Sequence, residues 1–228
     1  MEASRKPRVE GRGCRCAGAA LVAVVALGAS AHDFWIEPAK FRASLGDAIG
    51  LGLFVGDAFV GEPVGRDEGR IKRFFVVDPT GAEHAPVGRP GDHPAGRYRP
   101  SMEGVHLAAY RSFDAFVTLD GAKFEAYLKE EGLEEISKRR AERGVSDRVA
   151  KEAYSRCAKA LFRIGEGGDS AFDRRTGFEL EIVPERDPYD LRAPASLPVR
   201  LYRDGKPLAG AAVSALLKND APSTTPLP

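Results

Sequence analysis

The sequence predicts a mainly β protein: an antiparallel β-sandwich with a small helical insert, followed by an incomplete second β segment. Two observations predict this class. Short apolar, β-branched and aromatic runs recur between residues 33 and 119, separated by turns rich in Gly, Pro and Asp and with no helical period between them. The hydrophobic period becomes helical near residue 123, and strand-like runs return after residue 178.

Residues 1–31 have the pattern of an export signal. Basic side chains precede an apolar run of 11 residues at positions 17–27. A membrane-spanning helix needs roughly 20 residues, so this run is too short to be an anchor. The Ala-Ser-Ala triplet at 29–31 is the small-x-small pattern that signal peptidase cuts. We therefore expect cleavage after Ala31, a periplasmic or secreted protein with no permanent membrane anchor, and His32 as its first residue.

The cysteines and the net charge argue against a lipoprotein, a disulfide-bonded protein and a nucleic-acid-binding protein. Cys14 and Cys16 precede the apolar run, whereas a lipoprotein cysteine would follow it. Processing leaves only Cys157, which excludes an intramolecular disulfide and favours a partly buried, inert thiol. The 197 residues after the cleavage site carry 29 basic and 31 acidic side chains, a formal charge of −2. This balance gives no reason to expect nucleic acid as a partner.

The expected sandwich domain covers residues 32–184. The alternating run at 49–55 has glycines at every second position early on, and Asp78-Pro79-Thr80-Gly81 predicts a β-turn with Pro in its second position. Trp35 is expected in the core. The strands predicted before the helical insert share short apolar or aromatic runs and comprise residues 34–36, 49–55, 70–77, 105–110 and 116–119.

The helical insert is expected at about residues 121–157. Phe124, Tyr127 and Leu128 are spaced i, i+3, i+4, which predicts a helix up to Gly132, and a second helix follows to residue 143. Ser146 is a candidate N-cap for a third helical piece, in which Val149, Ala153 and Cys157 would share one face. Residues 158–164 fit either a strand or the end of that helix.

The C-terminal part is predicted to be a linker and the start of a second domain. A strand is expected at 178–183, and the proline-rich stretch at 185–196 reads as a linker. Residues 197–202 and 211–218, with a turn at 203–206, predict a hairpin. Because a lone hairpin is marginal in water, we expect the sequence to stop within a truncated second β domain at 197–228.

The candidate metal ligands are His32 and His106. A first-residue histidine offers both an α-amine and an imidazole nitrogen, and such donors favour Ni, Co, Cu or Zn over Mg or Ca. Two nitrogens need a third ligand, and His106 lies on a predicted strand of the same domain. The alternative is that His32 is a frayed terminal residue and His106 a hydrogen-bonded strand histidine. His84 and His93, in Gly- and Pro-rich loops, are expected to be solvent-exposed.

No catalytic signature accompanies these histidines. The sequence has no Gly-x-Ser-x-Gly elbow, no His-Glu-x-x-His helix and no P-loop. The carboxylate pairs at 130–131 and 134–135 lie on the charged face of the expected insert, away from any apolar pocket that would raise a pKa. We therefore expect a protein that is not an enzyme, with neither catalytic nor cofactor-binding residues.

Several motifs together resemble an exported family. The chain resembles the family called domain of unknown function 4198, which is grouped with NikM-like nickel/cobalt uptake components. The resemblance covers residues 32–218. The motifs that carry it are residues 32–38 (HDFWIEP), 105–107 (VHL), 110–112 (YRS), 123–133 (KFEAYLKEEGL), 155–161 (SRCAKAL), 180–185 (LEIVPE), 197–201 (LPVRL) and 205–211 (GKPLAGA).

The resemblance implies an exported β-rich protein whose second domain is immunoglobulin-like or carboxypeptidase-regulatory-like, and whose partner is a membrane metal-uptake transporter. In the NikM-like branch a histidine in second position holds the metal, and cleavage after Ser30 would reproduce that arrangement here. Members usually continue past the equivalent of Lys218, where another histidine is common, and this chain has none there.

Two other functions compete with metal uptake. One is a structural or protein-interaction module of the cell envelope with no metal role, whose contacts would be indifferent to chelators. The other is a copper oxidase with a histidine brace, for which the terminal histidine is the only supporting feature.

Overall fold

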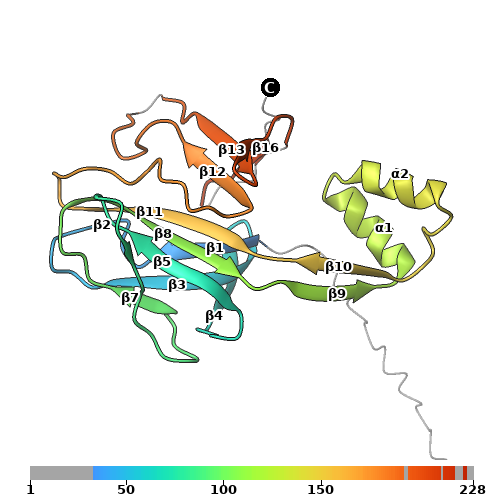
Figure 1. Cartoon of the computed structure of the whole chain (residues 1–228), viewed down its shortest axis with the longest axis horizontal. Helices are drawn as coiled ribbons and strands as arrows, with labels where there is room; N and C mark the ends of the chain where they lie inside the picture. Colours follow the sequence, from blue (N-terminus) through green and yellow to red (C-terminus); the bar gives the residue numbers. More distant parts are fainter. Residues whose placement is uncertain (1–32, 193–194, 212, 219–222, 225–228) are drawn as a thin grey trace, which may run out of the picture.

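The computed structural model describes residues 33–192, 195–211, 213–218 and 223–224. Two sheets form its body, and a two-stranded ribbon with two helices at its far end projects from one side (Figure 1). Strands make up 42% and helices 10%, which confirms the predicted class of a mainly β sandwich with antiparallel sheets. The expected export signal at 1–31 lies outside the described residues, as does His32.

The first sheet is built around β3. One edge of β3 pairs with β1, and the other edge pairs with β4 and β7, all antiparallel. Its strands are β1 (Asp33–Pro38), β3 (Ile49–Asp57), β4 (Val60–Val64) and β7 (Gly96–Tyr98). Alternation along β3 turns Ile49, Leu51 and Leu53 into the core and leaves Gly50 and Gly52 on the outer face. A Cβ atom there would lie 2.9 Å from Pro94 or 2.7 Å from Phe54, which explains the two glycines.

The second sheet has five strands in the order β2-β11-β8-β5-β6, antiparallel except for β2 against β11. All nine residues of β8 are buried, because strands flank both its edges and protein covers both its faces. The strands of this sheet are β2 (Arg42–Ala43), β5 (Ile71–Val77), β6 (Glu83–His84), β8 (Gly104–Ser112) and β11 (Cys157–Ile164).

Two hydrophobic clusters lie on opposite faces of the second sheet. The cluster between the sheets contains Leu51 and Leu53 from β3 and Tyr110 and Phe162 from β8 and β11. The cluster on the outer face contains Leu107 of β8 and residues of the segment after β11. The second sheet is therefore the middle layer of three.

An arm extends from the body, and we define it as residues 115–154. It consists of β9 (Ala115–Leu119), α1 (Gly121–Glu130), α2 (Glu134–Glu142) and β10 (Ala150–Tyr154), with β9 and β10 antiparallel. β9 continues the direction of β8, and β10 leads into β11, so the arm is the far end of one long hairpin (Figure 1). Its own small core contains Phe124 and Leu128.

The third helical piece expected after Ser146 is wrong. Residues 150–154 form β10, and the helices of the insert end at Glu142. The physical reason is that β9 offers a hydrogen-bonding edge along its whole length, and five residue pairs use it. Residues 158–164, which fitted either a strand or the end of a helix, form a strand, because β11 pairs with the edge of β8.

The C-terminal part departs from the expected hairpin. β13 (Val199–Arg203) pairs with β12 (Leu180–Pro184) and the short β14 (Lys206–Pro207), not with residues 211–218. The expected turn at 203–206 is present, with Asp204 and Gly205 in the left-handed region at φ 47° and 79°. β15 (Ser214–Ala215) pairs instead with β16 (Ser223–Thr224).

We predict that the arm unfolds independently of the body, because its core is separate from the two clusters of the sandwich. Leu128 is 2% exposed, so Leu128→Ala should cost the arm about 2–5 kcal/mol. Hydrogen-exchange mass spectrometry should show faster exchange in α1 and α2 and unchanged exchange in β8. Leu133→Ala, at a leucine 40% exposed in the same arm, is the matched control. Equal acceleration in β8 would contradict independence.

Candidate functional site

His106 is a buried strand residue, as the alternative interpretation of the sequence holds. It is 0% exposed on β8, where its Nδ1–H donates to the Gly104 carbonyl oxygen at 3.2 Å. Its ring stacks on Phe162 at a centroid distance of 5.3 Å and lies 5.6 Å from the Tyr98 ring. Burial lowers the pKa of His106, so the imidazole is neutral in the fold.

The surroundings of His106 do not fit a metal ion. Its Nε2 is buried and makes no hydrogen bond within the described part of the chain. A lone pair of this kind could bind a metal, but no group of three or more His, Cys, Asp or Glu residues that could hold one occurs among the described residues. The ring stacked on the imidazole is that of Phe162, which has no donor atom for a metal.

His84 is held by a buried carboxylate and is not a free loop residue. Its Nε2 lies 2.7 Å from Asp78, whose side chain also accepts hydrogen bonds from Thr80 and from the Ala82 amide. Burial alone would raise the pKa of Asp78, but these hydrogen bonds together lower it to about 2. Asp78 and His84 therefore close the turn after β5, which gives His84 a structural role.

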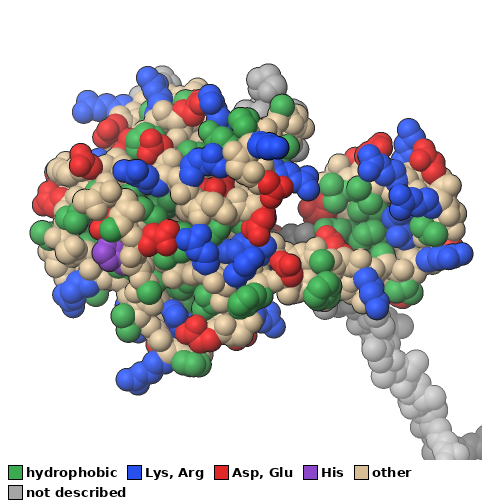
Figure 2. Space-filling model, viewed as in Figure 1, with side chains coloured by type: hydrophobic (Ala, Val, Ile, Leu, Met, Phe, Trp, Pro, Cys, Tyr) green, Lys and Arg blue, Asp and Glu red, His purple; other side chains and the backbone are tan. Residues whose placement is uncertain are grey.

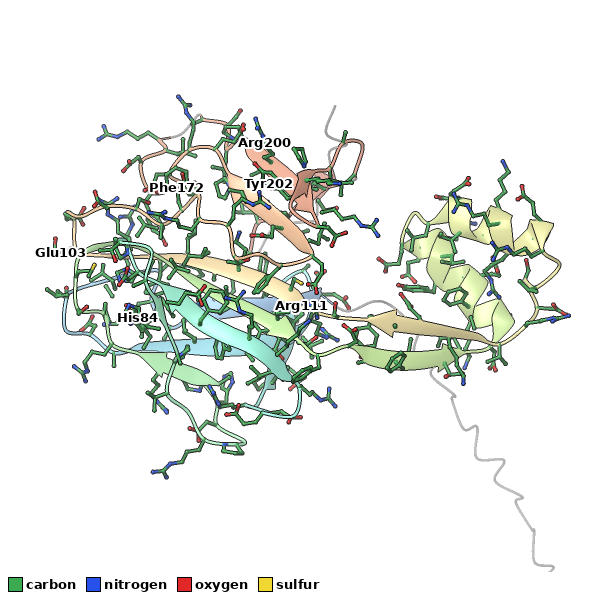
Figure 3. All side chains as sticks on the ribbon, in the orientation of Figure 1. His84, Glu103, Arg111, Phe172, Arg200 and Tyr202 are labelled. Carbon is green, nitrogen blue, oxygen red and sulfur yellow. The ribbon has the colours of Figure 1, made fainter. Side chains whose placement is uncertain are left out.

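The structure does not bring the start of β1 and His106 together. Asp33, which follows His32 in the chain, pairs with Gly56 at one end of β3, whereas Tyr98 beside His106 pairs with Ile49 at the other end. Seven residues of extended strand separate these ends by about 23 Å. Figure 3 shows His84 at the end of the sandwich away from the arm and Arg111 at the end beside it.

Trp35 faces outward, so its expected place in the core is wrong. Phe34 and Ile36 on either side of it pack into the core, and alternation turns Trp35 to the outer face of the first sheet. There it stacks on Phe54 at 5.5 Å, and Phe54 in turn contacts His93. His93 contacts this aromatic ring but is an exposed loop residue, as the sequence predicts.

Two ion pairs join the segment after β11 to the second sheet. Glu181, fully buried on β12, accepts hydrogen bonds from Thr176 and Gly177 and from Lys159 Nζ at 3.2 Å. Arg111, at the end of β8, forms a two-pronged pair with Glu179 at 2.7 and 3.1 Å. The hydrogen bonds from Arg111 are the main cause that lowers the pKa of Glu179 to about 2. Both pairs are therefore structural.

A groove of about 430 Å³ lies between the second sheet and β12–β13. Its walls are mainly apolar, and its polar lining consists of Cys157 and the Lys159–Glu181 pair. Burial raises the pKa of Cys157, which keeps the thiol protonated and agrees with the inert cysteine that the sequence predicts. Because its polar groups are already paired or protonated, this groove offers little chemistry for a ligand.

A second pocket, of about 390 Å³, lies where the arm leaves the body, and we call it the arm-root pocket. Arg156, in the link between β10 and β11, lines it and stacks over Phe34 of β1 and Tyr154 of β10, at 5.2 and 5.8 Å from the ring centroids. The remaining lining residues are mainly aromatic or apolar and include Val55, Val64, Tyr110, Phe113, Ala115 and Phe116. This pocket combines an apolar wall with a guanidinium group.

The fold defines an antiparallel β-sandwich protein with a projecting helical arm. The chain belongs to the family described as domain of unknown function (DUF4198), whose family model matches residues 29–227. No curated protein and no solved structure matches the chain. Among the described residues, no helix is both long and apolar enough to cross a membrane.

Sequence reasoning missed the arm-root pocket. Arg156 falls in the motif at 155–161 that carries the family resemblance, but nothing in that motif indicates a pocket. Its surroundings depend on the packing of β1 against the second sheet, which no local pattern encodes. The Tyr154-x-Arg156 spacing, which puts an aromatic ring and a guanidinium on one face of an extended chain, is the single local signal that could have pointed to it.

Burial lowers the pKa of His106 in the folded protein, so below about pH 6.5 the unfolded chain takes up a proton on this imidazole more readily than the folded one. We therefore predict that the free energy of unfolding falls as the pH is lowered from about 6.5 toward the pKa of His106 in the fold. The contribution is fully present above the unfolded pKa and is lost as the pH falls below it. Urea unfolding of His106→Phe should show a flatter pH dependence in this window.

The variant Asp78→Asn distinguishes the pH dependence caused by His106 from the pH dependence caused by the carboxylate of Asp78. The pKa of Asp78 falls from 3.8 to about 2 on folding, so its contribution is lost only at lower pH. An unchanged slope below pH 6.5 in His106→Phe would contradict the assignment to His106.

Proposed function

We propose that this protein is an exported, non-enzymatic binding module that handles a transition metal, nickel or cobalt, for a membrane uptake transporter. The observation that carries the proposal is where the fold begins. β1 starts at Asp33, directly after the Ala-Ser-Ala cleavage pattern at 29–31. Cleavage after Ala31 would thus leave every strand of the sandwich intact and place His32 beside an exposed strand end.

The proposed ligands are the α-amine and imidazole of His32, completed by the carboxylate of Asp33. Asp33 is exposed at the end of the first sheet, where its carboxylate accepts a long hydrogen bond, 3.4 Å, from the Ala58 amide. Two nitrogens and one oxygen suit Ni, Co or Cu. His106 has no part in this set, since it is sealed at the other end of β3.

The test is calorimetric titration of protein that begins at His32 with Ni, Co and Cu salts. Binding should be tighter than about 1 mM and should weaken as the pH falls below about 8, since protons compete for the amine and then the imidazole. His32→Ala should weaken it at least about tenfold, a loss of one nitrogen ligand. His93→Ala is the matched control and should leave it within about twofold. Equal losses in the two variants, or no binding, would refute the metal role.

The arm favours a second candidate function, a protein-interaction module of the envelope without a metal role. On the ribbon face turned away from α1, Phe116 is 77% exposed and its cross-strand neighbour is Ala153. Val149, which precedes β10, is also exposed, and Figure 2 shows basic and acidic side chains on the arm. An exposed apolar face of this kind on a projecting element is typical of a protein contact.

A photo-crosslinking amino acid at position 116 tests this second function in intact cells. The interaction role predicts one discrete product whose yield does not change with a chelator. The same amino acid at Lys151, which lies on the same ribbon next to the apolar face, is the positional control for a contact centred on Phe116. If crosslinking gives no product, or many products in equal yield at positions 116 and 151, the result would argue against a partner at the arm.

A further inference from the structure

The backbone of Arg156 is fixed where the long hairpin changes from body to arm. Its amide donates to the Ser112 hydroxyl at 2.9 Å, and its carbonyl accepts from the Ser112 amide, also at 2.9 Å. Its guanidinium lies over Phe34 of β1 and Tyr154 of β10. Backbone and ring contacts thus hold the side chain at the wall of the arm-root pocket.

The guanidinium of Arg156 makes no ion pair or hydrogen bond within the part of the chain that the structure describes. The other charged groups of the pocket are occupied: Arg70 pairs with Asp67 at 3.2 Å, and Asp114 pairs with Arg111 at 3.2 Å. Arg156 therefore supplies the pocket with one uncompensated positive charge and a planar set of donors, which matches a carboxylate in two-pronged geometry.

Tyr110 adds a neutral donor to the same wall. It is 4% exposed, and its hydroxyl makes no hydrogen bond to any described residue. Burial raises the pKa of Tyr110, and the charges of Arg156 and Arg70, which line the same pocket, oppose that rise. Because Tyr110 lines the pocket, its hydroxyl is free to donate a hydrogen bond to a ligand there.

The apolar walls define the rest of the ligand. Rings of Phe34, Phe113 and Phe116 line the pocket, and Phe113 is 51% exposed. The volume of about 390 Å³ falls in the range of small-molecule sites. Such walls stabilise a flat apolar body and give a bare inorganic anion nothing to pack against.

We propose that the arm-root pocket binds a small organic carboxylate with an aromatic body, whose carboxylate pairs with Arg156 and accepts a hydrogen bond from Tyr110. The pocket is formed by β1, the end of β8 and the base of the arm, so an occupied pocket would also stiffen the junction between arm and body. This ligand site is independent of a metal at the N-terminus.

Calorimetric titration of the metal-free full chain with phenylacetate and with its uncharged amide, phenylacetamide, tests the proposal. The acid should bind at least about tenfold tighter than the amide, because only the acid pairs with the guanidinium. Arg156→Gln should abolish that preference. Arg175→Gln, at another arginine stacked on a ring (Tyr202, 3.9 Å), is the matched control and should keep it.

Tyr110→Phe provides a second variant that preserves the packing of the ring. It should weaken phenylacetate about fivefold and leave phenylacetamide less affected, as expected for one lost hydrogen bond. Melting curves show whether Arg156→Gln and Tyr110→Phe fold. If one of them does not, the binding measured with the other tests the proposal. Equal binding of acid and amide, an unchanged preference in folded Arg156→Gln, or no saturable binding of either probe up to about 10 mM would overturn the proposal.

Discussion

The antiparallel ladder between β8 and β11 is the interaction on which the rest of the structure depends. Eight residue pairs run from Arg111↔Cys157 to Gly104↔Ile164. Side chains on one face of this ladder pack against the first sheet, and those on the other face pack against the segment before β12. The same two chains continue as β9 and β10, so one long hairpin sets the layers of the body, the direction of the arm and the pocket at its root.

This construction gives the sandwich two different ends. At one end the His106 imidazole is stacked among aromatic rings and is kept neutral because water is excluded. Asp78 and His84 close the neighbouring turn there. At the other end β1 begins at an exposed aspartate, the arm departs, and Arg156 lacks a described carboxylate partner. The groups with unused binding capacity that ligands can reach thus gather at the arm end, and both proposals concern that end.

The sequence was sufficient to predict elements that have a strong local signal, but not the packing between them. Alternating apolar runs and Gly or Asp turns predicted β3, β5 and β8, and the i, i+3, i+4 spacing around Phe124 predicted α1. Residues 149–157 also fit a helical face, and only the free edge of β9 decides that they form a strand. Trp35 lies on a strand with aromatic residues on both faces, so alternation cannot say which face is buried. Arg156 acquires its role through Phe34, far away in sequence.

The central claim is that the exported protein begins where the sandwich begins. The most direct test is the N-terminal sequence, with the intact mass, of the protein recovered from the periplasmic or secreted fraction. The account predicts a single species that starts at His32, one residue before β1. A chain that keeps residues 1–31, or one that starts inside β1, would contradict it, because neither would present a histidine amine beside Asp33.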